Sequence, residues 1–245
     1  MSARAATADV LLPDAWLSRT LGTPAFSLRL PVPSALDAEL ARLPDPAFCF
    51  AKVPEADAAS AAALGAAGFR QVDMQVTLER GADPAPVAPG AEVRLAEPED
   101  RDDVLNIAGS CFRFSRFHQD SRIGARTANK LKRAWMANCL DGKRGEEVLV
   151  ALDQGRPAGF LAVLLAPDAA VIDLIAVAAG RQRSGIGGAL VNAFIGRWRS
   201  RAGRLRVGTQ EANAASLRLY EGCGFRAVGK SRVLHAHLRN GMVMQ

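Results

Sequence analysis

VIDLIAVAAGRQRSGIGGAL, residues 171–190, joins an apolar run to a turn rich in Gly and Arg and then to a helical segment. Only Asp173 interrupts the apolar run Val171–Val177, which predicts a strand. Glycine lets the backbone of the turn come close to a ligand because no Cβ stands in the way. The helix behind the turn presents unpaired N–H groups and the positive end of its dipole. This order of elements predicts a site for a pyrophosphate group.

Two common phosphate-binding loops do not fit the turn. A dinucleotide fingerprint needs a third Gly where this chain has Leu190, and a P-loop needs Lys where it has Ala189. The pattern that fits is Gln/Arg-x-x-Gly-x-Gly/Ala after an apolar strand, with Gln182, Gly185 and Gly187. It resembles the acetyl-CoA loop of the GCN5-related N-acetyltransferases, the GNAT superfamily. The alternative is a turn that starts a helix and binds nothing.

A second signal lies downstream of this loop. Arg204–Thr209 alternates as a strand does, and Gln210–Gly224 then predicts a short helix. Asn213 suits the N-cap, and Tyr220 follows after about two helical turns, on the same face. An Asn and a Tyr at this spacing, followed by Gly-Phe, resemble the GNAT signature after the fifth strand. The resemblance implies that Asn213 contacts the cofactor and that Tyr220 protonates the departing thiolate.

The same resemblance implies an α/β (α+β) fold, in which helices flank a mixed central sheet, and acetyl-CoA as cosubstrate. Strand 173–177 should diverge from its neighbour and offer backbone N–H groups to the acetyl oxygen, where they stabilise an oxyanion. A phenol of pKa about 10 is close enough to a thiol of about 8.5 to act as its general acid, and Tyr220 is the only tyrosine. The residues that the resemblance assigns to acetyl-CoA are Ile175, Ala176, Val177, Gln182, Arg183, Ser184, Gly185, Ile186, Gly187, Gly188 and Asn213.

The stretch Cys111–Ile123 has an unusual composition, with three Phe, three Arg, one His and one Asp. Loops of this kind often carry recognition. Guanidinium groups suit phosphate, and aromatic rings can stack on a base or a sugar. The alternative is a turn at a helix end, with Phe in the core and Arg at the surface. The candidate substrate-binding residues are Arg113, Phe114, Arg116, His118 and Asp173.

Three stretches resemble a narrower family, dTDP-fucosamine acetyltransferase: Ser115–His118, the helix that holds Trp135, and residues 206–220. Those enzymes acetylate the amino group of a nucleotide-linked 4-amino-6-deoxy sugar, so the resemblance implies such an acceptor. Val228–His237 departs from the pattern, because no substrate residue can be matched there. An amino acid, a polyamine or a protein amine is the alternative acceptor. A non-catalytic acetyl-CoA-binding regulator is the alternative from another class.

The general base is left open by the sequence. Asp173 lies on the cofactor strand but suits a structural hydrogen bond equally well. His118 lies in the Phe-rich stretch, and His235 and His237 share a face of the last strand. Each histidine titrates in a suitable range, and a chain of water molecules is a further route for the proton.

Composition limits the class of protein. Hydrophobic residues make up 49% of the 245 residues, enough for a sizeable core and too many for a disordered chain. The four cysteines show no Cys-x-x-Cys spacing, so we expect free thiols and no metal site. The formal net charge is +6, but the basic residues are scattered. We therefore expect no nucleic-acid partner; attraction of an anionic small substrate is the alternative to a merely solvated surface.

Neither a signal peptide nor a membrane helix is indicated. The N-terminus has no long apolar core, and the most apolar segment, Phe160–Gly180, is interrupted by Pro167, Asp168 and Asp173. We expect a soluble cytoplasmic protein without a membrane partner. The sequence does not determine the oligomeric state, and a homodimer is compatible with it.

An internal repeat defines the expected domains. Pro54–Val72 aligns without a gap to Gln210–Val228, with nine of nineteen positions identical. We therefore expect residues 1–80 to form a truncated GNAT-like domain, 81–91 a Pro-rich linker and 92–245 the catalytic domain. In the first copy, Leu64 replaces Tyr220 and Asp57 replaces Asn213. That copy also lacks the Gly-rich loop, so we expect it to bind no acetyl-CoA and to help wall the substrate cleft.

Overall fold

The computed structural model describes residues 10–81, 83, 91–240 and 242–244. The chain divides into two compact units, one formed by residues 1–74 with 230–245 and the other by residues 75–229. Two strands, β4 (Arg70–Arg80) and β10 (Arg226–Arg239), begin in one unit and end in the other.

This division corrects the boundaries that the sequence predicts. The C-terminal segment 230–245 belongs with the N-terminal unit and not with residues 92–229. The physical reason is strand pairing, because Ser231–Leu238 of β10 pairs antiparallel with residues 47–54 of the first unit. Most of the predicted linker, residues 82 and 84–90, lies outside the described residues.

The sheet of the second unit is formed by β4 (its residues 75–80), β5 (Val93–Leu95), β6 (Glu147–Asp153), β7 (Arg156–Ala166), β8 (Ala169–Val177) and β9 (Leu205–Gln210). Their order is β4-β9-β8-β7-β6-β5. Strands β8 and β9 run parallel, and the other neighbours run antiparallel. The sheet is therefore mixed, as the sequence predicts.

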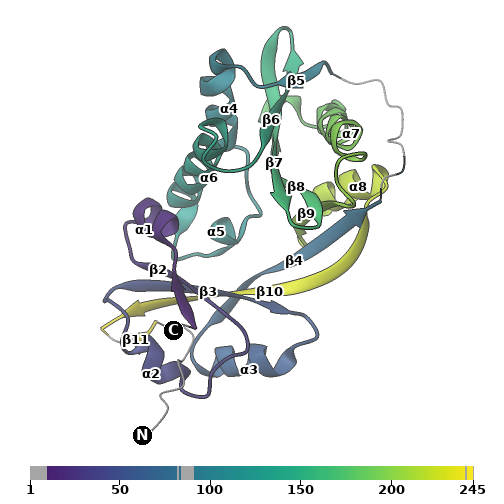
Figure 1. Ribbon diagram of the computed structural model, residues 1–245. Coiled ribbons are helices and arrows are strands. Elements are labelled where there is room, and N and C mark those ends of the chain that lie inside the picture. The colour runs from purple at the N-terminus through teal and green to yellow at the C-terminus, as the bar shows by residue number, and fades with distance from the viewer. Residues whose placement is uncertain (1–9, 82, 84–90, 241, 245) are drawn as a thin grey trace, which may run out of the picture. The chain divides into compact units, whose positions relative to one another are not determined.

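Helices cover both faces of this sheet (Figure 1). Side chains of successive strand residues point to opposite faces, so Leu149 and Leu161 pack with one set of helices and Val150 and Phe160 with the other. The first core includes α7 (Ile186–Trp198) and α8 (Ala214–Gly222), and the second includes α4 (Arg101–Ala108) and α6 (Gly124–Leu140). Three single-turn helices complete the unit: η1 (Pro98–Asp100), α5 (Arg116–Gln119) and η2 (Ala179–Arg181).

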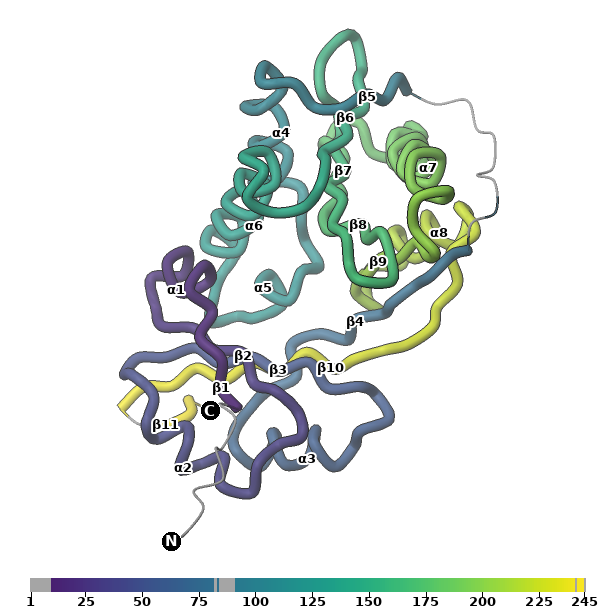
Figure 2. Tube along the Cα trace, in the orientation of Figure 1, coloured from purple at the N-terminus to yellow at the C-terminus, as the bar shows by residue number. Residues whose placement is uncertain are grey.

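The first unit has its own sheet and core. Its elements are β1 (Leu11–Pro13), α1 (Ala15–Leu21), β2 (Ala25–Leu28), α2 (Leu36–Leu40), β3 (Ala47–Pro54), α3 (Ala58–Ala66) and β11 (Met242–Val243), together with most of β10. Cys49 and Val53 of β3 and Leu234 of β10 are buried on one face of this sheet, with Leu36 and Leu64 from the helices. Figure 2 shows α2 and α3 on the same side of β3 and β10.

The two copies of the sequence repeat fold alike. Helices α3 and α8 each have nine residues, and a side chain caps the start of each. The Asp57 side chain accepts a hydrogen bond from Ser60 N at 3.0 Å, and the Asn213 side chain accepts one from Ser216 N at 3.2 Å. The caps have φ/ψ of −89°/72° and −88°/68°. Similar local sequence has therefore produced the same helix start twice.

Among the described residues, none of the helices combines the length and the apolar character needed to span a membrane.

Candidate active site

Strands β8 and β9 separate part-way along their length. They pair only where Ala170, Val171 and Ile172 lie opposite residues 205–207. Strand β8 bulges against β7 at this point, because Ile172 faces Val163 whereas Leu174 faces Ala162, and Asp173 is the extra residue. A bulge bends a strand and re-aims its side chains. The end of β8, from Asp173 to Val177, is thereby free of β9 within the described part of the chain.

A cavity of about 660 Å³ lies at this opening. Its walls come from the separated strands, the Gly-rich loop, α8, the Phe-rich stretch and α6. The residues are Ile172–Val177, Gln182, Arg183, Gly185, Gly187, Gly188, Val207–Gln210, Asn213, Ala215, Ser216, Leu219, Tyr220, Cys111–Ser115 and Lys132.

The backbone of β8 aims alternate N–H groups at the open side. Ala178 N donates to Ala158 O at 2.8 Å, so by alternation Ala176 also faces β7. The carbonyl of Val177 instead accepts from Gln182 Nε2 at 3.3 Å. The N–H groups of Ile175 and Val177 therefore point away from β7, and of the three predicted strand residues Ala176 does not offer its N–H to the cavity.

The loop before α7 leaves its N–H groups available. Within the described residues, the N–H groups of positions 182–188 donate no backbone hydrogen bond. Gly185 caps the helix with φ of 86°, and Arg183 has φ of 65°, which costs a non-glycine residue about 1–3 kcal/mol. Ser184 Oγ donates to Arg181 O at 2.6 Å. A run of outward N–H groups at a helix start suits an anion.

Close packing of α7 against α8 depends on one glycine. A Cβ on Gly187 would lie 3.2 Å from Leu219 Cδ2, which is tighter than an ordinary contact. The start of α7 thus lies beside the helix that carries Asn213 and Tyr220.

The side chain of Tyr220 forms part of the cavity wall. The residue is 2% exposed, and its ring packs edge-on to Phe225 at 6.1 Å. Its hydroxyl makes no hydrogen bond to any residue that the structure describes. Burial raises the pKa of this phenol above its ordinary value. The group is therefore protonated at all physiological pH values and open to a ligand in the cavity.

Comparison with known proteins identifies the family. The model of the acetyltransferase (GNAT) family matches residues 101–225. The chain belongs to this family. Members of this family use acetyl-CoA as their cosubstrate.

One curated relative and two solved structures are also similar to this chain. It is 31% identical over 140 residues to the spore coat polysaccharide biosynthesis protein SpsD of Bacillus subtilis, a match covering 57% of this chain and 48% of SpsD. The chain thus spans about half the length of that relative. A GCN5-related N-acetyltransferase of Sphaerobacter thermophilus superposes with a TM-score of 0.62 at 13% identity, over 96% of this chain and 77% of the other. A tandem GNAT protein from the clavulanic acid biosynthesis pathway, solved without acetyl-CoA, gives 0.57 at 16% identity, over 88% and 76%.

In this chain, Asp173 accepts three hydrogen bonds from nitrogen donors. Arg144 donates from Nε to Oδ2 and from Nη2 to Oδ1, both at 2.7 Å, and Trp135 Nε1 donates to Oδ2 at 2.8 Å. The carboxylate side chain is 9% exposed. Cys139 lies beside it, and burial, followed by the charge of Asp173, raises the pKa of that thiol to about 12. A carboxylate bound in this way by a guanidinium and an indole N–H is suited to anchor the strand.

The Phe-rich stretch divides between the cavity and its support. Arg113 and Phe114 line the cavity, whereas Arg116 and His118 lie on α5 and are not among the described lining residues. His118 contacts Ser115 Oγ through Nδ1 at 2.6 Å and Asn129 Oδ1 through Nε2 at 2.9 Å. Burial lowers the pKa of His118. A neutral ring with both nitrogens bonded joins α5 to α6, and the substrate contact of His118 stays a prediction.

His235 and His237 lie on β10 in the first unit. Both rings contact Phe48 of β3, with centroid distances of 4.8 and 5.1 Å. Both histidines stay candidates for the general base.

Sequence reasoning missed two charged residues of the second unit, Arg144 and Lys132. Arg144 lies in the turn after α6, and nothing in its local sequence connects it with Asp173. For Lys132, the sequence does contain an indication. It lies next to Leu131 in the buried stripe of α6, whose other members, Ala128, Met136 and Cys139, are apolar. A lysine in such a stripe is unusual.

Proposed function

We propose that this enzyme transfers acetyl from acetyl-CoA to the amino group of a nucleotide-linked amino sugar. The observation that carries the proposal is the single cavity whose walls include both the Gly-rich loop and the Arg113–Phe114 segment. The loop suits the pyrophosphate of CoA, and the Arg/Phe segment suits a second, phosphate-bearing ligand. The match to SpsD, named for polysaccharide biosynthesis, supports a sugar-related acceptor.

Acetyl-CoA binding follows from the backbone geometry. N–H groups of residues 182–188 bind the pyrophosphate, with Asn213 and the start of α7 beside it. The pantetheine arm enters the opening between β8 and β9. There the N–H groups of Ile175 and Val177 replace the missing partner strand and reach the thioester carbonyl. Donors fixed in place before the reaction stabilise an oxyanion better than water does.

The chemical step uses few side chains. The neutral amine attacks the thioester carbon and forms a tetrahedral oxyanion, and the nitrogen loses a proton to water. Collapse of the intermediate breaks the C–S bond, and the Tyr220 phenol protonates the CoA thiolate. Asp173 is the only carboxylate among the described residues that line the cavity, and its bonds to Arg144 favour a positioning role. The amine therefore needs to bind in its neutral form.

A transfer assay read by mass spectrometry tests this function. Acetyl-CoA is supplied with dTDP- and UDP-linked amino sugars, and separately with amino acids, polyamines and an N-terminal peptide. We expect a mass gain of one acetyl group on a nucleotide-linked amino sugar. Acetylation of only the other amines would refute the sugar acceptor and leave the acetyltransferase activity. Binding of acetyl-CoA without transfer to any amine would favour a regulator.

A further inference from the structure

We infer that Arg144 is a positioning residue, which fixes the bulge of β8 and, through it, the N–H groups of Ile175 and Val177. The inference rests on the proposed function in one respect, namely that these two N–H groups bind the thioester carbonyl of acetyl-CoA. It assigns a role to the turn between α6 and β6. Arg144 lies in that turn and is not among the described residues that line the cavity.

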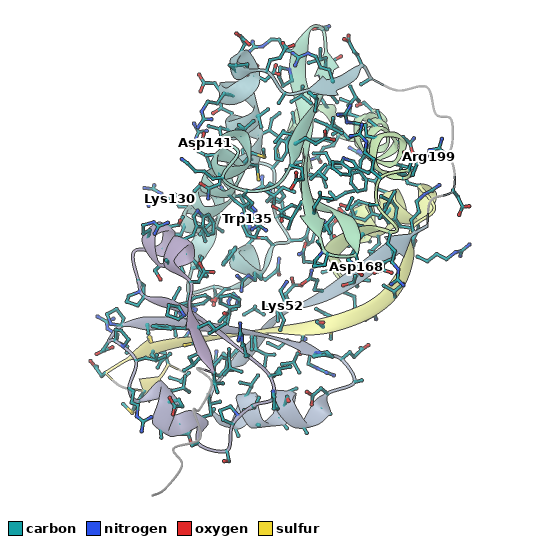
Figure 3. All side chains as sticks on the ribbon, in the orientation of Figure 1. Lys52, Lys130, Trp135, Asp141, Asp168 and Arg199 are labelled. Atoms are coloured by element: carbon teal, nitrogen blue, oxygen red, sulfur yellow. The ribbon has the colours of Figure 1, made fainter. Side chains whose placement is uncertain are left out.

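The Arg144 side chain holds Asp173, the extra residue of the bulge, in one orientation. Its Nε and Nη2 donate to different carboxylate oxygens at 2.7 Å, and Trp135 Nε1 donates to Oδ2 at 2.8 Å. Trp135 belongs to α6 and is labelled in Figure 3. A two-pronged bond between guanidinium and carboxylate sets direction as well as distance. A bulge leaves its extra residue outside the regular strand pairing, so these side-chain bonds fix the course of β8 beyond it.

The turn that carries Arg144 is itself attached to the elements on either side. The N–H groups of Lys143 and Arg144 donate to Asn138 O of α6, at 2.9 and 3.1 Å. Glu146 N donates to Val163 O of β7 at 2.8 Å. The turn therefore cannot move relative to α6 or β7 without breaking backbone hydrogen bonds.

Val163 connects this turn with the bulge. On one edge of β7 it accepts the bond from Glu146, and on the other edge it faces Ile172, where the register between β7 and β8 changes. Gly145 has φ of 79°, and a Cβ at this position would overlap Val163 O. Close approach of the turn to β7 thus requires glycine. The turn and the bulge are attached to the same residue of β7 from opposite edges.

Loss of the guanidinium would release the bulge. The Asp173 side chain is only 9% exposed, and a buried carboxylate that loses its cation moves toward water or takes up a proton. Ile175 and Val177 follow on a part of β8 that β9 does not pair with in the described chain. Their N–H groups would be displaced, whereas the N–H groups of residues 182–188 would stay in place. The contact with the acetyl group should weaken, and the binding of the rest of CoA should not.

Calorimetric titration with acetyl-CoA, and separately with CoA, tests this difference without an acceptor. CoA has no thioester carbonyl. In Arg144→Met we expect the dissociation constant of acetyl-CoA to rise about 3- to 10-fold, the range of a lost hydrogen bond, and that of CoA to stay unchanged. In turnover, kcat should fall about 10- to 100-fold, more than KM rises, because the oxyanion depends on placed donors more than the ground-state carbonyl does.

Arg197→Met is the matched control. Arg197 donates from Nε and Nη2 to the two oxygens of Glu147, both at 2.8 Å, and Trp198 Nε1 donates to the same carboxylate at 2.7 Å. The side chains of Arg197 and Arg144 are each 37% exposed. Both variants lose one charge and one ion pair of similar burial, so both should lose similar stability. Only Arg144→Met should bind acetyl-CoA more weakly relative to CoA.

A second pair of variants moves the turn without removing a charge. Gly145→Ala should push the turn away from Val163 and reproduce the binding pattern of Arg144→Met. Gly142→Ala also places a side chain at positive φ, 66°, in this turn, but its Cβ would have no described neighbour within 4 Å. It should bind both ligands as the wild type does. A wild-type ratio of the two dissociation constants in folded Gly145→Ala would contradict the role of the turn.

The arginine pair decides the inference even if Gly145→Ala does not fold. An unchanged ratio in Arg144→Met, or the same change in Arg197→Met, would overturn it. If no nucleotide-linked amino sugar is acetylated but acetyl-CoA binding depends on Arg144 as expected, the proposed acceptor fails and the positioning role stands. If the sugar is acetylated and Arg144→Met keeps the wild-type ratio and kcat, the proposed function stands and the positioning role fails.

Discussion

Tyr220 is the residue that the proposed chemistry uses most directly. Tyr220→Phe removes a hydroxyl that has no partner among the described residues, so stability should change by less than about 1 kcal/mol. We expect kcat to fall about 100-fold or more, the usual contribution of a general acid, with the KM for acetyl-CoA little changed. Release of CoA thiol measures the rate. Full turnover with the wild-type pH dependence would contradict this role.

A second substitution tests the prediction that Asp173 anchors strand β8. Asp173→Asn removes the charge that balances Arg144, which is 37% exposed, so we expect a loss of about 1–3 kcal/mol in the free energy of unfolding, reduced by solvent around the guanidinium. Strand β8, which we propose to bind the acetyl group, should shift, and kcat/KM should fall. The pH–rate profile should keep its shape, because a residue that only positions the strand takes no part in proton transfer.

The control for this substitution is Asp168→Asn. Asp168, which is labelled in Figure 3, also pairs with an arginine, Arg206, but its side chain is 56% exposed. Stability and activity should both stay close to the wild type, since exposed ion pairs contribute little. Disappearance of an acidic limb from the pH profile in Asp173→Asn alone would identify Asp173 as the base after all.

At the scale of elements, the two copies of the helix cap, Asp57 before α3 and Asn213 before α8, allow the effect of a cap on stability to be distinguished from its effect on acetyl-CoA binding. Asn213→Ala and Asp57→Ala each remove a side-chain cap of the same geometry, and each should lower the free energy of unfolding, because a backbone N–H at the helix start loses its acceptor. Only Asn213 lines the cavity with the Gly-rich loop. We therefore expect Asn213→Ala to raise the KM for acetyl-CoA and Asp57→Ala to leave it unchanged. Chemical denaturation measures the effect on stability, and steady-state kinetics measures the effect on KM. If the two variants had equal KM values for acetyl-CoA, Asn213 would serve only as a helix cap.

At the scale of the whole molecule, the exchange of strands makes the C-terminus part of the N-terminal fold. Truncation after Gly229 removes the partner of β3 over residues 231–238 and takes Leu234, Ala236 and Leu238 from the core. We expect backbone amides of residues 47–54 to lose protection in hydrogen exchange, because an uncovered strand exposes its N–H and C=O groups.

Truncation after Arg239 is the milder comparison. It removes β11 but keeps all of β10, so protection of β3 should persist. Full protection of residues 47–54 after the longer truncation would show that the N-terminal unit does not need its C-terminal strand.

The sequence alone determined the parts of the site that depend on local spacing. The order strand–loop–helix over 171–198, the Asn213 cap and the position of Tyr220 on α8 follow from patterns only a few residues long, and local backbone preference decides such patterns. The mixed sheet and the family followed from the same motifs and are confirmed. The predicted roles of the acetyl-CoA and substrate residues stay predictions.

Only the tertiary structure decided which distant segments meet. Asp173 is 29 residues from Arg144 and 38 from Trp135, and no local periodicity links them. Two further features depend on segments that are distant in the sequence. One is the bulge that re-aims Asp173. The other is the pairing of β10 with β3, which overturned the predicted domain boundary. Strand partners and buried ion pairs are chosen by packing and by the need to satisfy every buried polar group, and these requirements act across the folded chain, not along it.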